Sequence, residues 1–128
     1  PVLGTCAGLV LMARCDDPRV QSLELLDLQV ERNAYGRQTH SFVTELRIDL
    51  SGVRRFRGIF IRAPRIAAWA PEVEILARDD ARPVLVAQGP HMGMSFHPEL
   101  AGDLRIHAAW LQRANTSLAG TNSRRVSA

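Results

Sequence analysis

The feature that most constrains this chain is a cysteine placed between two glycines at the end of a short apolar run, in the segment PVLGTCAG at residues 1–8. The pattern G-x-C-x-G is typical of a nucleophile elbow, in which a strand ends, the chain turns sharply through the nucleophile and a helix begins at once. Two backbones pass closely in such a turn, so the flanking residues must be small, and Gly4 and Gly8 supply that room. The pattern therefore predicts a strand, a strained turn at Cys6 and a helix.

Cys6 is a candidate nucleophile. The N-terminus of the helix expected from about Gly8 favours a thiolate, because the helix dipole is positive there. The backbone N–H of Ala7, the residue after the nucleophile, would point to the oxyanion that forms when the sulfur attacks an acyl carbon. A lone cysteine at a strand end can also be a small buried apolar residue, so this segment alone leaves both interpretations open.

The segment MSFHPEL at residues 94–100 supplies the partners that a cysteine nucleophile needs. His97 and Glu99 are two residues apart, and in an extended chain that spacing places both side chains on one side. Pro98 favours this extended geometry, because it fixes its own φ and biases His97 away from the helical region. We expect His97 to take the Cys6 proton and Glu99 to hold the imidazole in the accepting tautomer. Without the elbow, a surface turn would be the better interpretation of His-Pro-Glu.

Composition limits the class of protein. With 128 residues, 46% of them apolar, the chain is expected to form one domain with a proper core. Two cysteines are too few for a disulfide framework, and the absence of a signal peptide or a long apolar run favours a soluble, cytoplasmic protein with no membrane association. All sixteen basic residues are arginines scattered among thirteen acids, which argues against nucleic-acid binding despite the net charge of +3.

Hydrophobic periodicity outlines a mixed α/β chain. Residues 41–50 alternate strictly and predict a half-exposed antiparallel strand, and two runs joined by Asp79-Asp80-Ala81 predict a hairpin. The polar loop at residues 32–38 is expected to carry function, as such loops often do. The predicted elements are a helix over 9–13, strands over 25–31, 41–50, 58–61, 73–77, 83–88 and 92–96, and a closing helix over 104–113 that Asp103 caps. In that helix, Leu104, Ala108 and Leu111 are expected to form one apolar face, with Ile106, Ala109 and Trp110 beside it.

Four segments together resemble one known family: GTCAG at 4–8, VERNAYGRQ at 30–38, FIRAP at 60–64 and SFHPEL at 95–100. From Pro1 to about Trp110 the chain is similar to the glutaminase subunit of pyridoxal 5'-phosphate synthase, a class I, triad-type glutamine amidotransferase. The elbow and the His-x-Glu pair are common to all triad amidotransferases. The ERNAYGRQ and IRAP segments are specific to this family.

The resemblance implies an α/β, flavodoxin-like three-layer sandwich of the class I glutamine amidotransferase type. It implies a glutamine amidotransferase domain over residues 1–114, and we expect the polar tail 115–128 to be disordered. The implied activity is hydrolysis of L-glutamine to L-glutamate and ammonia, which passes to a separate synthase subunit for pyridoxal 5'-phosphate (vitamin B6) biosynthesis. No metal and no bound coenzyme is needed for this step.

The resemblance also assigns residues position by position. Cys6, His97 and Glu99 match the family's catalytic triad. Arg32, Ile61 and Arg62 match its glutamine-binding positions. Without the resemblance, each arginine would be interpreted as a solvated surface charge.

The sequence departs from the family pattern in three places. The family carries an N-terminal part before the elbow, with a Gly-Gly-Glu-Ser loop that binds glutamine and completes the oxyanion hole, and this sequence contains neither. We therefore expect an N-terminally truncated domain, inactive as residues 1–128 alone. His40 stands where the family has an acid, and Glu24 stands where it has a glycine.

Two other classes of function stay open at this stage. An elbow with a His-x-Glu pair also serves other cysteine hydrolases of related architecture, such as peptidases and amidases. A truncated chain could instead be an inactive interaction protein that keeps the motifs without the activity.

Overall fold

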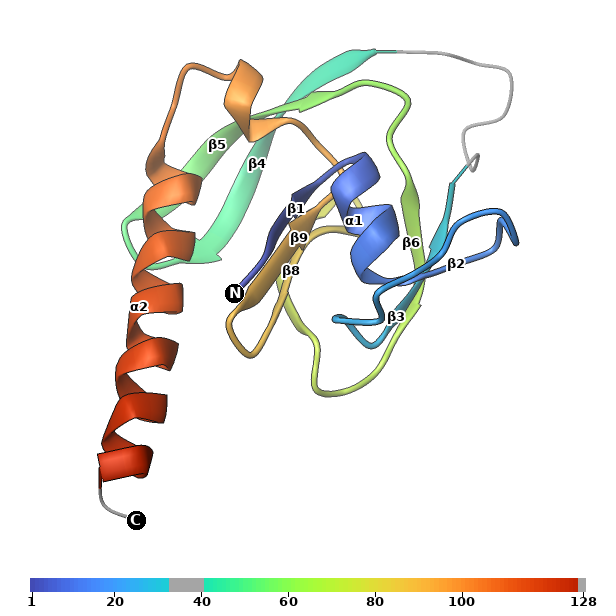
Figure 1. The fold of residues 1–128 in the computed structure, drawn as a ribbon. Helices are drawn as coiled ribbons and strands as arrows, with labels where there is room; N and C mark the ends of the chain where they lie inside the picture. The colour runs from blue at the N-terminus through green and yellow to red at the C-terminus, as the bar shows by residue number, and fades with distance from the viewer. Residues whose placement is uncertain (33–40, 127–128) are drawn as a thin grey trace.

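The computed structural model describes residues 1–32 and 41–126, with side chains up to residue 120. The described chain is a mixed α/β fold in which strands outnumber helices (Figure 1). Its elements are β1 (Leu3–Thr5), α1 (Ala7–Met12), β2 (Arg14–Cys15), β3 (Leu28–Glu31), β4 (Phe42–Leu50), β5 (Val53–Phe60), β6 (Arg65–Trp69), β7 (Glu74–Asp79), β8 (Arg82–Gln88), β9 (His91–Met94), a 3₁₀ turn (Pro98–Leu100) and α2 (Arg105–Val126).

The strands form two sheets. A six-stranded sheet has the order β1-β9-β8-β7-β4-β5, and a three-stranded sheet has the order β2-β3-β6. β1 runs parallel to β9, with Leu3 opposite Met92 and Thr5 opposite Met94, while the other neighbours in the larger sheet are antiparallel. The carboxyl ends of β1 and β9 therefore meet at one edge, where the elbow and the His-Pro-Glu segment follow.

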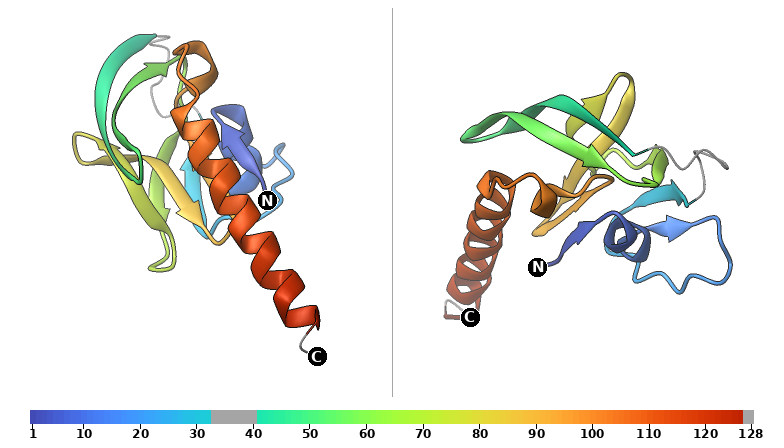
Figure 2. Two further views of the ribbon diagram at one scale, coloured as in Figure 1. Left: turned by 90° about the vertical axis from the view of Figure 1, so that its left-hand side faces the viewer. Right: turned by 90° about the horizontal axis from the view of Figure 1, so that it is seen from above.

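The two helices lie on opposite faces of the sheet around β9 (Figure 2). Met92 and Met94 point toward α2 and share an apolar cluster with the fully buried Ile106. Gly93 points the other way, where the side chain of Leu9 from α1 fills the space beside it. This layering of helix, sheet and helix is the one expected from the sequence.

The antiparallel strands confirm the periodicity analysis. In β4 the buried positions Leu46 and Ile48 alternate with exposed charged residues, and β7 and β8 form the predicted hairpin. β5 begins at Val53, earlier than the predicted apolar strand at 58–61. Its first half was missed because the buried Val53 and Phe56 are separated by two exposed arginines. β6 was not predicted, since its sequence RIAAW is short and its second half is exposed.

The C-terminal helix corrects two predictions. α2 continues to Val126, so residues 115–126 are helical where a disordered tail was expected. A polar composition is a poor signal here, because a helix that is already nucleated extends at little cost. The apolar face predicted to pack on the core instead faces solvent. Leu104 and Leu111 are exposed, whereas Ile106 and Ala114 are buried. Neither helix in the described ranges is long and apolar enough to cross a membrane.

Candidate active site

The elbow has the predicted geometry. β1 ends at Thr5, α1 begins at Ala7, and Cys6 between them has φ 51° and ψ −104°, in the region that favours glycine. The Cys6 N–H donates to the Met94 carbonyl at 2.9 Å, which ties the strained residue to the end of β9. Strain of this kind persists only where the surroundings hold it, and it is concentrated at functional sites.

The two glycines of the motif differ in their roles. A Cβ on Gly4 would lie 2.3 Å from the sulfur of Met12 and 2.8 Å from the backbone carbon of Gly8, so Gly4 is needed for the close approach of β1 and α1. A Cβ on Gly8 would meet nothing within 4 Å. The expectation that both positions must lack a side chain is therefore wrong for Gly8. The Gly8 backbone lies close to Gly4, but a side chain on Gly8 itself would point into open space.

His97 and Glu99 form a pair, although not by the predicted extended geometry. His97 itself is extended, with φ −108° and ψ 89°, but Glu99 lies in the 3₁₀ turn Pro98–Leu100. His97 Nδ1 lies 2.6 Å from the Glu99 Oε1 atom, and the His97 backbone N–H donates to the Ile59 carbonyl at 2.8 Å. A carboxylate accepts from Nδ1–H, which leaves Nε2 as the free acceptor of the imidazole.

The charge environment of Cys6 differs from the prediction. Burial raises the pKa of the Cys6 thiol; the backbone N–H of Ala7 lowers that pKa, and the Glu99 carboxylate raises it further. The helix N-terminus was expected to favour a thiolate, which corresponds to a lowered pKa. In the structure desolvation outweighs the single backbone donor, because a charged sulfur loses more solvation than one N–H restores. At neutral pH the resting form is the thiol, and a base must remove its proton.

A pocket of about 410 Å³ opens beside the sulfur and brings several predicted residues together. Cys6, Ala7, Arg32 and Arg62 line it, together with apolar side chains of Val10, Leu11, Val20 and Pro64. The pocket therefore combines a nucleophile, two cations and an apolar wall, which suits a small substrate with a carboxylate and a short aliphatic stem.

Ile61 and Arg62 follow the end of β5: Arg62 lines this pocket, and Ile61 contacts the Cys6 sulfur through its carbonyl oxygen. The Ile61 carbonyl oxygen accepts from the Cys6 Sγ atom at 3.8 Å, and Arg62 has φ 47°, again in the region that favours glycine. His97 and Glu99 do not line the pocket, but the Glu99 carboxylate is close enough to change the pKa of Cys6. After Ala63 and Pro64 the chain enters β6, which pairs with β3 so that Arg65 lies opposite Glu31, the residue before Arg32.

Arg32 has a partner that sequence analysis did not identify. Its guanidinium Nη1 lies 3.1 Å from the Asp17 Oδ2 atom, and its backbone N–H donates to the Asp16 carboxylate at 3.1 Å. No local pattern links Asp17 to Arg32, because the two are fifteen residues apart.

One departure noted in the sequence falls on a described residue. Glu24 has φ 51°, a left-handed conformation in which glycine is favoured, in keeping with the glycine expected there from the resemblance. His40 and the rest of the predicted loop after Arg32 lie outside the described residues. In the described ranges, no group of three His, Cys, Asp or Glu side chains is arranged to hold a metal ion.

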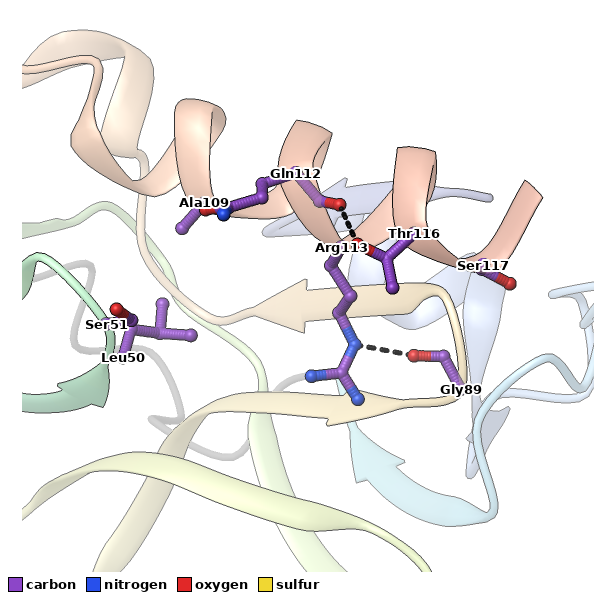
Figure 3. Close-up of a pocket in the computed structure, with 8 residues that line it drawn as sticks. All are labelled: Leu50, Ser51, Gly89, Ala109, Gln112, Arg113, Thr116 and Ser117. Atoms are coloured by element: carbon purple, nitrogen blue, oxygen red, sulfur yellow. Dashed lines mark hydrogen bonds between the residues drawn. The ribbon is translucent and has the colours of Figure 1, made fainter. Parts of the chain in front are cut away.

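A second pocket, of about 440 Å³, lies between α2 and the turns at Ser51 and Gly89 (Figure 3). Its main cation, Arg113, donates to the Gly89 carbonyl and pairs with Glu74. No predicted site residue lines this pocket, so it is separate from the candidate active site.

Comparison with known proteins bears on these observations. The profile of the SNO glutamine amidotransferase family matches residues 1–116. The chain belongs to this family. A crystal structure of a glutamine amidotransferase superposes with a TM-score of 0.82 at 43% sequence identity, over 88% of this chain and 60% of that one. The expected class I amidotransferase-like fold is thereby confirmed.

Two similar relatives carry the same name. The pyridoxal 5'-phosphate synthase subunit PdxT of Pseudothermotoga lettingae is 49% identical, over 94% of this chain and 62% of its own length. PdxT of Thermoplasma volcanium is 48% identical, over 87% of this chain and 55% of its own. The chain therefore spans about 60% of the length of the family members that it matches.

Proposed function

We propose that this protein is a glutaminase that hydrolyses L-glutamine to L-glutamate and ammonia. The observation that carries the proposal is the strained Cys6 at the elbow, which shares a pocket with Arg32 and Arg62. A paired histidine and carboxylate follow the neighbouring strand end. Membership of the glutamine amidotransferase family supports the same activity.

The first half-reaction forms a thioester. His97 takes the Cys6 proton through its free Nε2, and the sulfur attacks the side-chain amide carbon of glutamine. The resulting oxyanion lies near the backbone N–H of Ala7, a donor that is already oriented and so needs no reorganisation. His97 then returns the proton to the leaving nitrogen, and ammonia departs as the carbon–nitrogen bond breaks.

The second half-reaction releases glutamate. His97 takes a proton from water, the hydroxide attacks the thioester carbon, and the Cys6 sulfur leaves and is reprotonated. Glu99 stays ionised throughout; it orients the imidazole and stabilises the imidazolium that forms twice in the cycle. Because the resting thiol has a raised pKa, this histidine is needed to generate the nucleophile.

Substrate binding is assigned to Arg32, Ile61 and Arg62. Guanidinium groups hold a carboxylate in a fixed orientation, so the two arginines suit the α-carboxylate of glutamine. The Ile61 carbonyl oxygen faces the sulfur and offers an acceptor for the amide N–H of the bound side chain. The pocket's apolar wall then covers the methylene groups.

The relatives' name, a subunit of pyridoxal 5'-phosphate synthase, suggests the partner. We infer that the ammonia passes to a synthase subunit that builds pyridoxal 5'-phosphate, and that the two assemble as a hetero-oligomer. The glutaminase chemistry itself is carried by side chains and backbone groups and calls for no cofactor.

The experiment is reaction with acivicin, a glutamine-derived electrophile, followed by mass spectrometry, together with an assay of ammonia release. It uses residues 1–128 and a chimera that adds the part of the Pseudothermotoga lettingae relative that this chain does not span, both with the synthase subunit. In the chimera we expect labelling at Cys6, loss of ammonia release in Cys6→Ala and near-normal release in Cys15→Ala. Labelling mainly at Cys15, undiminished ammonia release in Cys6→Ala, or better turnover of peptides and simple amides than of glutamine would refute the proposal.

A further inference from the structure

The carboxylate of Asp17 binds two arginines, one of which, Arg32, lines the active-site pocket. The Arg19 guanidinium binds it in two places, with Nε 3.0 Å from Oδ1 and Nη2 2.8 Å from Oδ2. The Arg32 Nη1 atom lies 3.1 Å from the same Oδ2 atom. The Asp17 side chain is only 9% exposed, whereas that of Arg32 is 49% exposed. The Asp17 carboxylate is therefore held in place by its surroundings, whereas the more exposed Arg32 side chain depends on this contact for a defined position.

The Arg32 backbone is held as well. Its N–H donates to the Asp16 carboxylate, so adjacent acids on one turn hold the main chain and the guanidinium of the same residue. A free arginine side chain samples many rotamers and loses that freedom when it binds a ligand. An arginine held in advance pays less of this cost at the moment of binding.

The pairing leaves Arg32 able to bind an anion. Arg19 binds both oxygens of the Asp17 carboxylate, whereas Arg32 reaches it through one nitrogen, and Arg32 also lines the pocket beside Cys6 and Arg62. Hydrogen bonds from the Arg19 side chain, with lesser contributions from its backbone and from Arg32, hold the pKa of Asp17 well below its usual range. The carboxylate therefore stays ionised across the pH range in which such an enzyme works.

We propose that Asp17 is a positioning residue that orients Arg32 toward the α-carboxylate of the substrate, with Arg19 neutralising the excess negative charge. This inference rests on the proposed glutaminase function, because it names the residue that prepares one of the substrate-binding groups. Asp17 does not touch the reacting atoms, so it acts on substrate affinity and leaves the chemical step unchanged.

A purely local role is the competing explanation, and the chain contains a matched control for it. Asp17 also accepts the backbone N–H of Arg19, as an acid that closes a turn does. Asp103 and Arg105 repeat the same Asp-x-Arg contacts, backbone N–H and guanidinium included, at the start of α2. Asp103 pairs with Arg105, and Arg105 does not line the active-site pocket.

The kinetic test compares Asp17→Ala with Asp103→Ala, both made in the chimera described above and assayed with the synthase subunit. We expect Asp17→Ala to raise KM for glutamine about five- to tenfold, the loss typical of one charged contact, with kcat within about twofold of wild type. Asp17→Asn keeps one acceptor oxygen and should restore part of the affinity. Asp103→Ala should leave KM unchanged. An unchanged KM in Asp17→Ala, an equal rise in Asp103→Ala, or a fall in kcat at constant KM would each overturn the proposal.

A second measurement separates this inference from the proposed function. The rate at which phenylglyoxal modifies Arg32, followed by mass spectrometry, requires no turnover. We expect it to rise severalfold in Asp17→Ala and to stay constant in Asp103→Ala. If the chimera with the synthase subunit releases no ammonia from glutamine, the proposed function fails while this measurement still tests the contact between Asp17 and Arg32. If the Arg32 modification rate does not change in Asp17→Ala, the role of Asp17 fails whatever the activity.

Discussion

Replacing Gly4 by alanine tests whether the elbow depends on the close approach of β1 and α1. The added Cβ would lie 2.3 Å from the Met12 sulfur, 2.8 Å from the Gly8 carbonyl carbon and 2.9 Å from its oxygen. Met12 is 1% exposed and has no room to retreat, and the Gly8 atoms are backbone, so the whole of α1 must shift. Overpacking of this kind costs about 1–3 kcal/mol, and we place Gly4→Ala at about 3 because backbone must move.

The matched variant is Gly8→Ala, at the other glycine of the same motif. Its Cβ would enter open space on a helical residue, where alanine is more stable than glycine by about 0.5–1 kcal/mol. The two substitutions therefore have opposite signs. Thermal unfolding by circular dichroism should show a Tm lower by about 9 °C for Gly4→Ala and higher by about 2 °C for Gly8→Ala.

In the chimera with the synthase subunit, the activities of Gly4→Ala and Gly8→Ala should also differ. A displacement of α1 by about 1 Å moves the sulfur relative to His97 and costs about 10²-fold in turnover, whereas Gly8→Ala should retain activity. If Gly4→Ala is as stable as wild type, or if the two variants are destabilised equally, the elbow is not held by the contact that we describe.

Three further predictions follow from particular residues. Glu99→Gln removes a carboxylate that raises the pKa of Cys6, so the midpoint of the pH dependence of Cys6 alkylation by iodoacetamide should move to lower pH, although turnover falls. Burial is the larger cause of the raised pKa and should keep that midpoint above the value of a free thiol. A shift of the midpoint to higher pH would contradict this account. Arg62→Ala should raise KM for glutamine by about tenfold with little change in kcat, and an unaltered KM would remove Arg62 from the substrate site. Glu24→Gly relieves a residue at φ 51°, so Tm should rise by about 2 °C after the extra entropy of unfolded glycine is subtracted, and a lower Tm would show that the conformation is not strained.

The sequence alone was sufficient for the parts of the site that depend on neighbours in the chain. The elbow at Cys6 needs a small residue, a nucleophile and a helix start within a few positions, and the structure has this order. The contact between His97 and Glu99 likewise follows from a two-residue spacing, even though the turn that produces it was not the expected one. The alternation in β4 predicted its buried face correctly, because the period of a strand is a local property.

Only the tertiary structure decided the interactions between residues that are distant in the sequence, and the burial that results from packing. The pKa of Cys6 rises because packing removes solvent from the sulfur, and no local pattern records that loss. The inward face of α2 depends on where the sheet lies, so Ile106 rather than Leu104 is buried. The contact of Asp17 with Arg32 joins two turns that are separated in sequence. Desolvation and long-range ion pairs arise when the chain is folded, whereas turns, spacings and periods are properties of the chain before it folds.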